Sequence, residues 1–250
     1  SRSAAHEVTV ATSLVTVSDA ANITFDGLSF RGARGAAIVV RDSTDIVVSN
    51  GAIMDCGMSA FNVTGGARCG LQHMEVARAG TGGAVLAGGD RQTLTRGEHF
   101  VRDSHLHHSN RWLMNYAPLV LMAGVGQQVE RSVLSDAPQT AVFFQGNLHH
   151  VTNSTIRDVV QQCNDCGSFY FGRDWTYRGM QIKGCNFSLP GPMWSVILLE
   201  NHLAVASRPY CTVFLLKSTL AVLTASNRMT NGASLPFAQG HVLGCKRCVR

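Results

Sequence analysis

The sequence predicts an all-β protein, a single-stranded parallel β-helix of about seven coils, over residues 1–188. Three observations predict this fold. Seven segments repeat one spacing of apolar positions, every segment bends at the same place, and further apolar stretches lie between the segments. Residues 189–250 contain no coil that aligns with these segments. They form an irregular C-terminal tail, either a capping region or non-homologous sequence.

The repeat is defined by two apolar positions in each segment. The last residue of every segment is a large apolar residue, and successive last residues lie 22 to 31 positions apart. A second apolar residue stands five positions before it. The last residues are Phe30, Ile53, Val76, Leu106, Leu134, Ile156 and Phe187, and the earlier ones are Phe25, Val48, Leu71, Val101, Val129, Val151 and Ile182.

A bend is predicted three positions before each last residue. Five of the seven residues there are Gly, Asn or Asp, the types that most easily adopt a left-handed backbone. Each segment therefore reads as two short strands joined by a sharp bend. The apolar stretches between segments, such as 83–89, 119–124 and 141–146, supply a third strand. The bend residues are Gly27, Asn50, His73, Asp103, Arg131, Asn153 and Gly184.

Repeating coils of this kind bury their apolar positions inside a tube and pair each backbone with the coils on both sides. A β-sandwich is the alternative, but its strands need not keep one register across seven units. The three longest spacings, of 28, 30 and 31 residues, indicate insertions. We expect them to extend from one corner of the coil, where loops commonly carry function.

Composition and charge restrict the partners. The 250 residues carry a net charge of +5, which fits an acidic polysaccharide, but no dense Lys/Arg cluster indicates nucleic acid. The longest apolar run, near 211–225, is short and contains Lys217, so we expect no membrane partner. The two C-x-x-C motifs at 163–166 and 245–248 lie too far apart for a paired zinc site, and no metal is predicted. Cys69 and Cys185 fall on repeat positions and are expected to be buried.

Several motifs resemble a family of right-handed parallel β-helix proteins with the pectin-lyase-like fold. They are GGDRQTLTRG (88–97), RDSHLHHSNRW (102–112), YAPLVLMAGVG (116–126), LSDAPQTAVFFQGN (134–147) and NDCGSFYFGRDWTYRG (164–179). The resemblance covers residues 22–187 and implies carbohydrate chemistry, by polysaccharide lyases or glycoside hydrolases. The chain departs from it at Gln139, where such members carry histidine, and at Cys166, which replaces a small residue.

A column of titratable residues is predicted two positions after the last residue of five successive segments. It contains Asp55, Arg78, His108, Asp136 and Asp158. Stacked coils lie about 4.8 Å apart, which suits a pair of carboxylates in a retaining glycosidase, with Asp136 and Asp158 as the pair. The alternative is that these residues only cap turns at a solvated corner.

A second candidate site follows the strand at 168–172. The mixture of acids, arginines and aromatic rings there suits a sugar, with Asp165 and Asp174 as catalytic groups and the others binding substrate. The alternative is a salt bridge from Asp174 to Arg173 or Arg178, with Trp175 covering the core. The residues expected to converge are Asp165, Tyr170, Arg173, Asp174, Trp175 and Arg178.

The histidine-rich segment 105–116 supplies the third element. We expect His107, His108 and Arg111 to reach the same cleft. A shared metal ion is disfavoured because adjacent residues on a strand point to opposite faces. His149 and His150 begin a strand and are interpreted as structural or surface groups.

These residues favour a carbohydrate-active protein that cleaves a polysaccharide. Hydrolase chemistry is preferred over lyase chemistry because lysine is absent from the matched motifs. A lyase would use His108 as a base and Arg173 or Ca²⁺ to neutralise a uronate; no other cofactor is expected. The alternatives are a non-catalytic carbohydrate-binding or structural β-helix, or an inactive fragment. Because polysaccharides lie mostly outside the cytosol, an extracellular or secretory location is expected.

Overall fold

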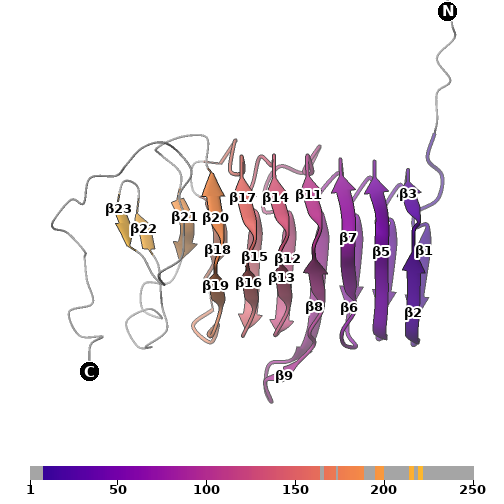
Figure 1. The fold of residues 1–250 in the computed structure, drawn as a ribbon, viewed down its shortest axis with the longest axis horizontal. Coiled ribbons are helices and arrows are strands. Elements are labelled where there is room, and N and C mark those ends of the chain that lie inside the picture. Colours follow the sequence, from indigo (N-terminus) through magenta and orange to yellow (C-terminus); the bar gives the residue numbers. More distant parts are fainter. Residues whose placement is uncertain are drawn as a thin grey trace, which may run out of the picture.

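The computed structural model describes residues 8–163, 166–172 and 174–188, together with the backbone of three short strands after residue 194. The described residues form strands and no helix, so none of them forms a helix that crosses a membrane. Two curled sheets of parallel strands run side by side along the molecule (Figure 1). The all-β class predicted from the sequence is confirmed.

The first sheet takes one strand from each repeat. Its strands, in order, are β1 (Val15–Ser18), β4 (Ile38–Arg41), β6 (Phe61–Thr64), β8 (Ala84–Asp90), β12 (Val120–Val125), β15 (Val142–Asn147), β18 (Gly167–Phe171) and β21 (Ser195–Leu199). The short strand β9 (Thr95–Arg96) pairs with β8 in the antiparallel sense. Strand β21 continues this sheet beyond residue 188, where the sequence repeat ends.

The second sheet contains the two strands that flank each predicted bend. The strands before the bend are β2 (Ala21–Asp26), the first half of β5 (Thr44–Met54), the first half of β7 (Gly70–Ala77), β10 (Phe100–Arg102), β13 (Gln128–Glu130), β16 (His150–Thr152) and β19 (Gln181–Lys183). The strands after it are β3 (Ser29–Arg31), the second halves of β5 and β7, β11 (His105–His107), β14 (Val133–Ser135), β17 (Thr155–Arg157) and β20 (Asn186–Ser188). A separate antiparallel pair, β22 (Phe214–Leu216) and β23 (Thr219–Ala221), follows.

The register of these ladders matches the register of the sequence repeat. Val101 pairs with Val129, and Val129 pairs with Val151. The last residues of the repeats pair in the same way, as Leu134 does with Ile156. Each strand therefore lies beside the equivalent strand of the neighbouring repeat. This pattern fits a parallel β-helix-like fold.

The paired apolar positions form the core between the sheets. Val101, Val129 and Val151 are fully buried, and Leu106, Leu134 and Ile156 are buried beside them. The ring of Phe144 in the first sheet stacks on that of Phe169, with centroids 5.9 Å apart. Burying a side chain of this size contributes about 1.5 to 3 kcal/mol, so the columns are the main source of stability.

The chain turns at three corners in each repeat. The first corner follows the strand of the first sheet, the second corner is the predicted bend, and the third corner leads back to the first sheet. At the second corner all seven predicted residues have positive φ, including His73 at 51° and Arg131 at 46°. Arg131 gains a bidentate contact with Asp103, at 2.7 and 2.8 Å. Tertiary contacts therefore hold a left-handed backbone even where the residue type does not favour it.

Two ladders of buried side chains link neighbouring repeats in the core. The first ladder precedes the first strand of the second sheet. In it the Cys69 amide donates to His99 Nδ1 (3.2 Å), the His99 amide to Gln127 Oε1 (2.9 Å) and the Gln127 amide to His149 Nδ1 (3.1 Å). These bonds satisfy amides at the first corner that the sheet ladders leave unpaired.

The serine ladder performs the same task after the second corner. The Met74 amide donates to Ser104 Oγ (3.0 Å), the Ser104 amide to Ser132 Oγ (3.2 Å) and the Ser132 amide to Ser154 Oγ (3.2 Å). Each of these serines also donates its hydroxyl to the carbonyl two residues earlier. Cys185 stands next in this column and is buried, as Cys69 is in the first ladder.

Candidate functional site

The outer face of the first sheet carries a column of apolar side chains. Leu121 pairs with Phe143, which pairs with Tyr170, so the three side chains lie on neighbouring strands. The rings of Phe143 and Tyr170 meet edge to face with centroids 5.0 Å apart. Because the strands alternate, the residues between them point into the core. Strands β12, β15 and β18 therefore form an aromatic floor.

Two cavities lie over this floor and share Tyr116 and Phe143. The smaller has a volume of about 130 Å³ and the larger about 360 Å³. We call them together the groove. The smaller cavity is lined by Asn115, Tyr116, Ala117, Pro118, Gln139, Thr140, Phe143, Cys163, Cys166 and Tyr170, and the larger by Tyr116, Leu121, Phe143, Gln145, Gly172 and Tyr177.

The loop between β11 and β12 forms one wall of the groove. At its base, Asn110 is 1% exposed and donates from Nδ2 to the carbonyls of Thr81 and Ala117. Trp112 Nε1 donates to the carbonyl of Gly57 at 2.6 Å. These bonds hold the loop against earlier repeats and so position Tyr116 beside the floor.

The third corner after β17 forms the facing wall. Cys163 and Cys166 are joined by a disulfide, and both line the smaller cavity. The sulfur of Cys166 lies 3.5 Å from Gln139 Oε1. Gln139, where the resemblance expects histidine, is therefore part of the groove.

The first corner after β18 contains Asp174, whose carboxylate is held by local bonds. It accepts from the amide and hydroxyl of Thr176 and forms an ion pair with Arg91 at 3.2 Å. The bonds from Thr176, and then Arg91, keep the pKa of Asp174 below its usual value. Arg91 also donates to Asn147 and lies over the ring of Tyr177. Asp174 therefore caps a turn and fixes this end of the groove.

The other residues predicted to converge at this corner lie in different places. Trp175 is 80% exposed and does not line the groove, whereas Tyr170 does. Arg178 pairs with Asn147 at the end of β15. Asp165 and Arg173 lie outside the described residues, so their predicted roles stay predictions.

The predicted column of titratable residues occupies the third corner. All five residues have positive φ, between 51° and 56°. The Ala137 amide donates to the carbonyl of Asp158 at 3.1 Å, so Asp136 and Asp158 lie on neighbouring repeats. Arg157 contacts both carboxylates, at 3.6 Å and 3.1 Å. One guanidinium therefore lies between the two carboxylates, and the catalytic role predicted for them stays a prediction.

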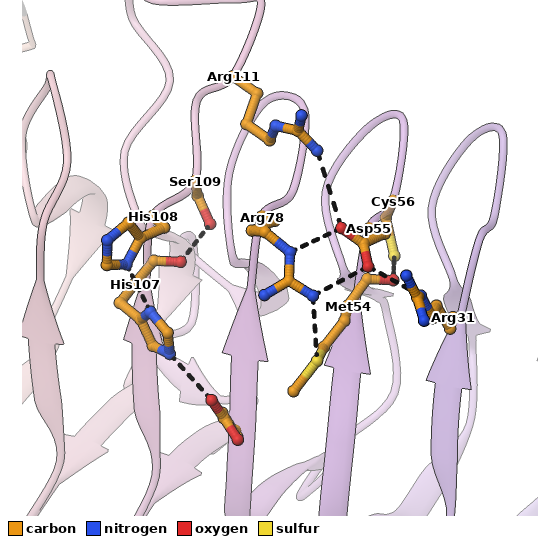
Figure 2. A network of polar contacts seen from close by, with 10 residues as sticks. Arg31, Met54, Asp55, Cys56, Arg78, His107, His108, Ser109 and Arg111 are labelled. Atoms are coloured by element: carbon orange, nitrogen blue, oxygen red, sulfur yellow. Dashed lines mark hydrogen bonds and ion pairs between the residues drawn. The ribbon is translucent and has the colours of Figure 1, made fainter. Parts of the chain in front are cut away.

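Histidines continue the polar surface of the third corner. His107 contacts His108 through its Nδ1 and Glu75 through its Nε2, at 2.7 and 3.2 Å (Figure 2). His105 stacks on His107 with centroids 4.2 Å apart, and its Nε2 lies 3.0 Å from Ser135 Oγ. No group of three or more metal-ligating side chains is arranged around one point in the part of the chain that the structure describes.

Asp55 is the centre of a cationic cluster at the same corner (Figure 2). Its carboxylate forms ion pairs with Arg31 at 2.9 Å, Arg78 at 2.7 Å and Arg111 at 3.7 Å. Hydrogen bonds from Arg78, followed by the charges of Arg78 and Arg31, lower the pKa of Asp55. Arg111 thus holds the base of the groove loop and does not face Asp174.

The two predicted sites do not come together. Asp136 precedes β15 and Asp174 lies near its far end, where Arg91 also contacts Asn147. The six residues of β15 span roughly 20 Å at about 3.3 Å per residue. Among the predicted residues, Tyr170 lines the groove.

Sequence reasoning missed Tyr116, Phe143, Gln145 and Tyr177. Phe143 and Gln145 alternate with buried Val142 and Phe144 in β15, so they occupy outward positions. That alternation is visible in AVFFQG and was a usable signal. Tyr116 gave none, because only the tertiary bonds of its loop bring it to the floor.

Comparisons with known proteins assign no family to this chain. No family model matches the chain, and no curated protein matches it. A solved structure named "Glycoside hydrolase" is similar with a TM-score of 0.45 and 14% identity. The match covers 68% of this chain and 34% of that one, so the chain spans about a third of the length of that structure.

Proposed function

We propose that this chain is a carbohydrate-binding protein that holds a glycan in the groove over β12, β15 and β18. The proposal rests on one observation: two cavities share Tyr116 and Phe143 and are lined by aromatic rings and side-chain amides. We further propose that its repeats form a single right-handed parallel β-helix of about seven coils, with the pectin-lyase-like fold. The parallel registers support this.

The groove has the composition that sugar recognition requires. Aromatic faces cover the apolar C–H surface of a pyranose ring, and a few well-placed polar groups fix its orientation. Tyr116 and Phe143 supply the rings, with the largely buried Tyr170 packed edge to face on Phe143. Gln139 and Gln145 supply amides that both donate and accept. The described lining contains no carboxylate, which favours binding over hydrolysis there.

Glycoside hydrolysis is the second candidate, at the third corner. It is favoured by Asp136 and Asp158, which lie on neighbouring repeats, because the strand spacing of about 4.8 Å is close to the separation of a retaining pair. For this chemistry Arg157 would have to move away from one carboxylate so that it can act as a proton donor. Lyase chemistry, with His108 as base and Arg173 or Ca²⁺ neutralising a uronate, remains a further prediction.

A panel of neutral and acidic polysaccharides separates these functions. Retention on an insoluble glycan without any product supports the binding proposal. Release of reducing ends that is abolished by Asp136→Asn establishes the hydrolase, and a new ultraviolet absorbance from an unsaturated product establishes the lyase. Absence of both binding and product across the panel would contradict all three.

Two aromatic variants test the location of the site. Phe143→Ala removes a ring from the floor, and we expect the affinity for the glycan to fall about tenfold, the effect of losing roughly 1.4 kcal/mol. Trp175→Ala removes an exposed ring at the first corner and serves as the matched control, with affinity unchanged. Titration calorimetry measures both. The reverse result would place the glycan at the corner that the sequence predicted.

The proposed compartment is extracellular or secretory. The disulfide between Cys163 and Cys166 supports it, because such bonds persist mainly in oxidising environments. A polysaccharide as the partner is consistent with that location. The division into a β-helix over residues 1–188 and a tail over 189–250 stays a prediction.

A further inference from the structure

The loop that walls the groove also exposes a run of large apolar side chains on its outer side. Trp112 is 62% exposed and Met114 is 44% exposed, with Leu113 between them. Met58, next to the Gly57 that accepts the Trp112 indole, is 49% exposed. We call Met58 and residues 112–114 the apolar patch. Leu28 and Trp175, at other corners, are exposed singly.

The patch is held in place by its own backbone contacts. The amides of Trp112 and Leu113 both donate to the carbonyl of Gly80, at 3.2 Å, and the Trp112 indole reaches Gly57. Asn110 closes the base of the loop. Because the loop is already ordered, a partner that covers these side chains loses little conformational entropy of the chain.

Positive charge surrounds the patch. Arg31, Arg78 and Arg111 share the single carboxylate of Asp55, and their side chains are 70%, 43% and 59% exposed. Figure 2 shows them along one edge, with the loop of Asp55 between those of Arg31 and Arg78. Nearby Glu75 is paired with His107, and Asp136 and Asp158 lie further along the same corner, where Arg157 contacts both. The three arginines around Asp55 therefore leave an excess of positive charge next to the patch.

We propose that this edge of the molecule binds the surface of an anionic lipid bilayer, with Leu113 and Met114 entering the interface and the arginines contacting headgroups. Aliphatic side chains gain nothing from a hydrated glycan, whereas apolar groups beside arginines are the pattern of interfacial membrane binding. One short loop is also small for a protein interface, which usually buries about 800 Å² on each partner. The sequence analysis expected no membrane partner because no apolar run is long enough to span a bilayer, but binding at the interface needs no spanning segment.

Vesicle binding tests the proposal with the full chain. We expect the protein to sediment with vesicles of phosphatidylcholine and phosphatidylserine, but not with phosphatidylcholine alone, and to be released by high salt. The tryptophan emission should shift to shorter wavelength on binding. Failure to bind the anionic vesicles, or equal binding to both compositions, would overturn the proposal.

Matched variants locate the contact. The double variant Leu113→Ser, Met114→Ser should lower the fraction bound about tenfold at fixed lipid, and Arg78→Gln should weaken binding and its salt dependence. Leu28→Ser and Arg131→Gln, which change an exposed apolar residue and a paired arginine at the second corner, should leave binding unchanged. Undiminished binding by the double variant would refute the assignment. If the double variant instead loses a protein or glycan partner and no variant binds vesicles, the edge serves that partner.

Discussion

The first ladder and the serine ladder solve one problem with different groups. Each accepts an amide hydrogen from the preceding repeat on a buried side chain, at 2.9 to 3.2 Å. The serine ladder repeats one residue type that does not titrate. The first ladder mixes cysteine, histidine and glutamine, and its two histidines are fully buried. The position therefore requires an acceptor of suitable reach, and its residue type sets the response to pH.

The largest expected difference between the two ladders is the effect of low pH on the stability that each contributes. Burial lowers the pKa of His99 and His149 to about 4, from the ordinary 6.5. Between these values the unfolded chain binds more protons than the folded one, so stability is complete above pH 6.5 and falls as the pH drops towards 4. When the pH reaches about 4, each histidine has lowered the free energy of unfolding by on the order of 3 kcal/mol. Urea unfolding at neutral pH and near pH 4.5 measures the loss.

Variants that keep the acceptor but not the titration provide the control. The double variant His99→Gln, His149→Gln places at both positions the amide acceptor that Gln127 already supplies. Because glutamine does not titrate, the free energy of unfolding of this variant should vary less between pH 6.5 and 4. Aspartates such as Asp45 and Asp103, whose pKa values are lowered by arginine, lose their contribution only at still lower pH. An unchanged profile in the double variant would show that other groups cause the acid sensitivity.

Loss of a linking side chain gives the next largest effect. Gln127→Leu keeps the approximate volume but leaves the His99 amide without its acceptor, and the carbonyls of Gly88, Ala123 and Val125 without the Gln127 amide. We expect a loss of about 3 kcal/mol in the free energy of unfolding. Chemical denaturation at neutral pH measures this loss. A loss smaller than that caused by Ser132→Ala in the serine ladder would contradict the expected order of the two effects.

The serine ladder should be less sensitive. Ser132→Ala leaves the Ser104 amide unpaired and should cost about 1.5 kcal/mol, with no change in the pH profile. Cys185→Ser, which extends the serines by one repeat, should change stability by less than about 0.5 kcal/mol. Thermal unfolding of the two variants beside the unaltered chain resolves this difference.

Much of the fold was predictable from the sequence. The apolar positions repeat because they share one interior, and the pairing of Val101, Val129 and Val151 follows directly from them. The bend was also predictable, since most of its residues tolerate positive φ. The ladders were not, because residues as different as His99 and Gln127 fill equivalent places. A search for similar residues does not detect a shared hydrogen-bonding role.

The candidate site was less predictable. The neighbouring positions of Asp136 and Asp158 follow from the repeat, but Arg157 between them does not. The sequence also gave no sign that Arg91 reaches Asp174 across more than eighty residues, with the segment that contains β9 projecting at the lower edge of Figure 1. Long side chains and inserted loops choose their partners through tertiary structure, which a repeat does not encode.

The stacked glycines at the end of the first sheet have a consequence for altering the chain. A methyl group on Gly124 would lie 2.1 Å from the carbonyl of Gly88, and one on Gly146 would lie 2.0 Å from that of Gly124. The hydrogen-bonded spacing of neighbouring strands thus leaves no room for a side chain at these positions. A substitution at either glycine has to displace the backbone of the adjacent repeat, so its damage is shared by two repeats.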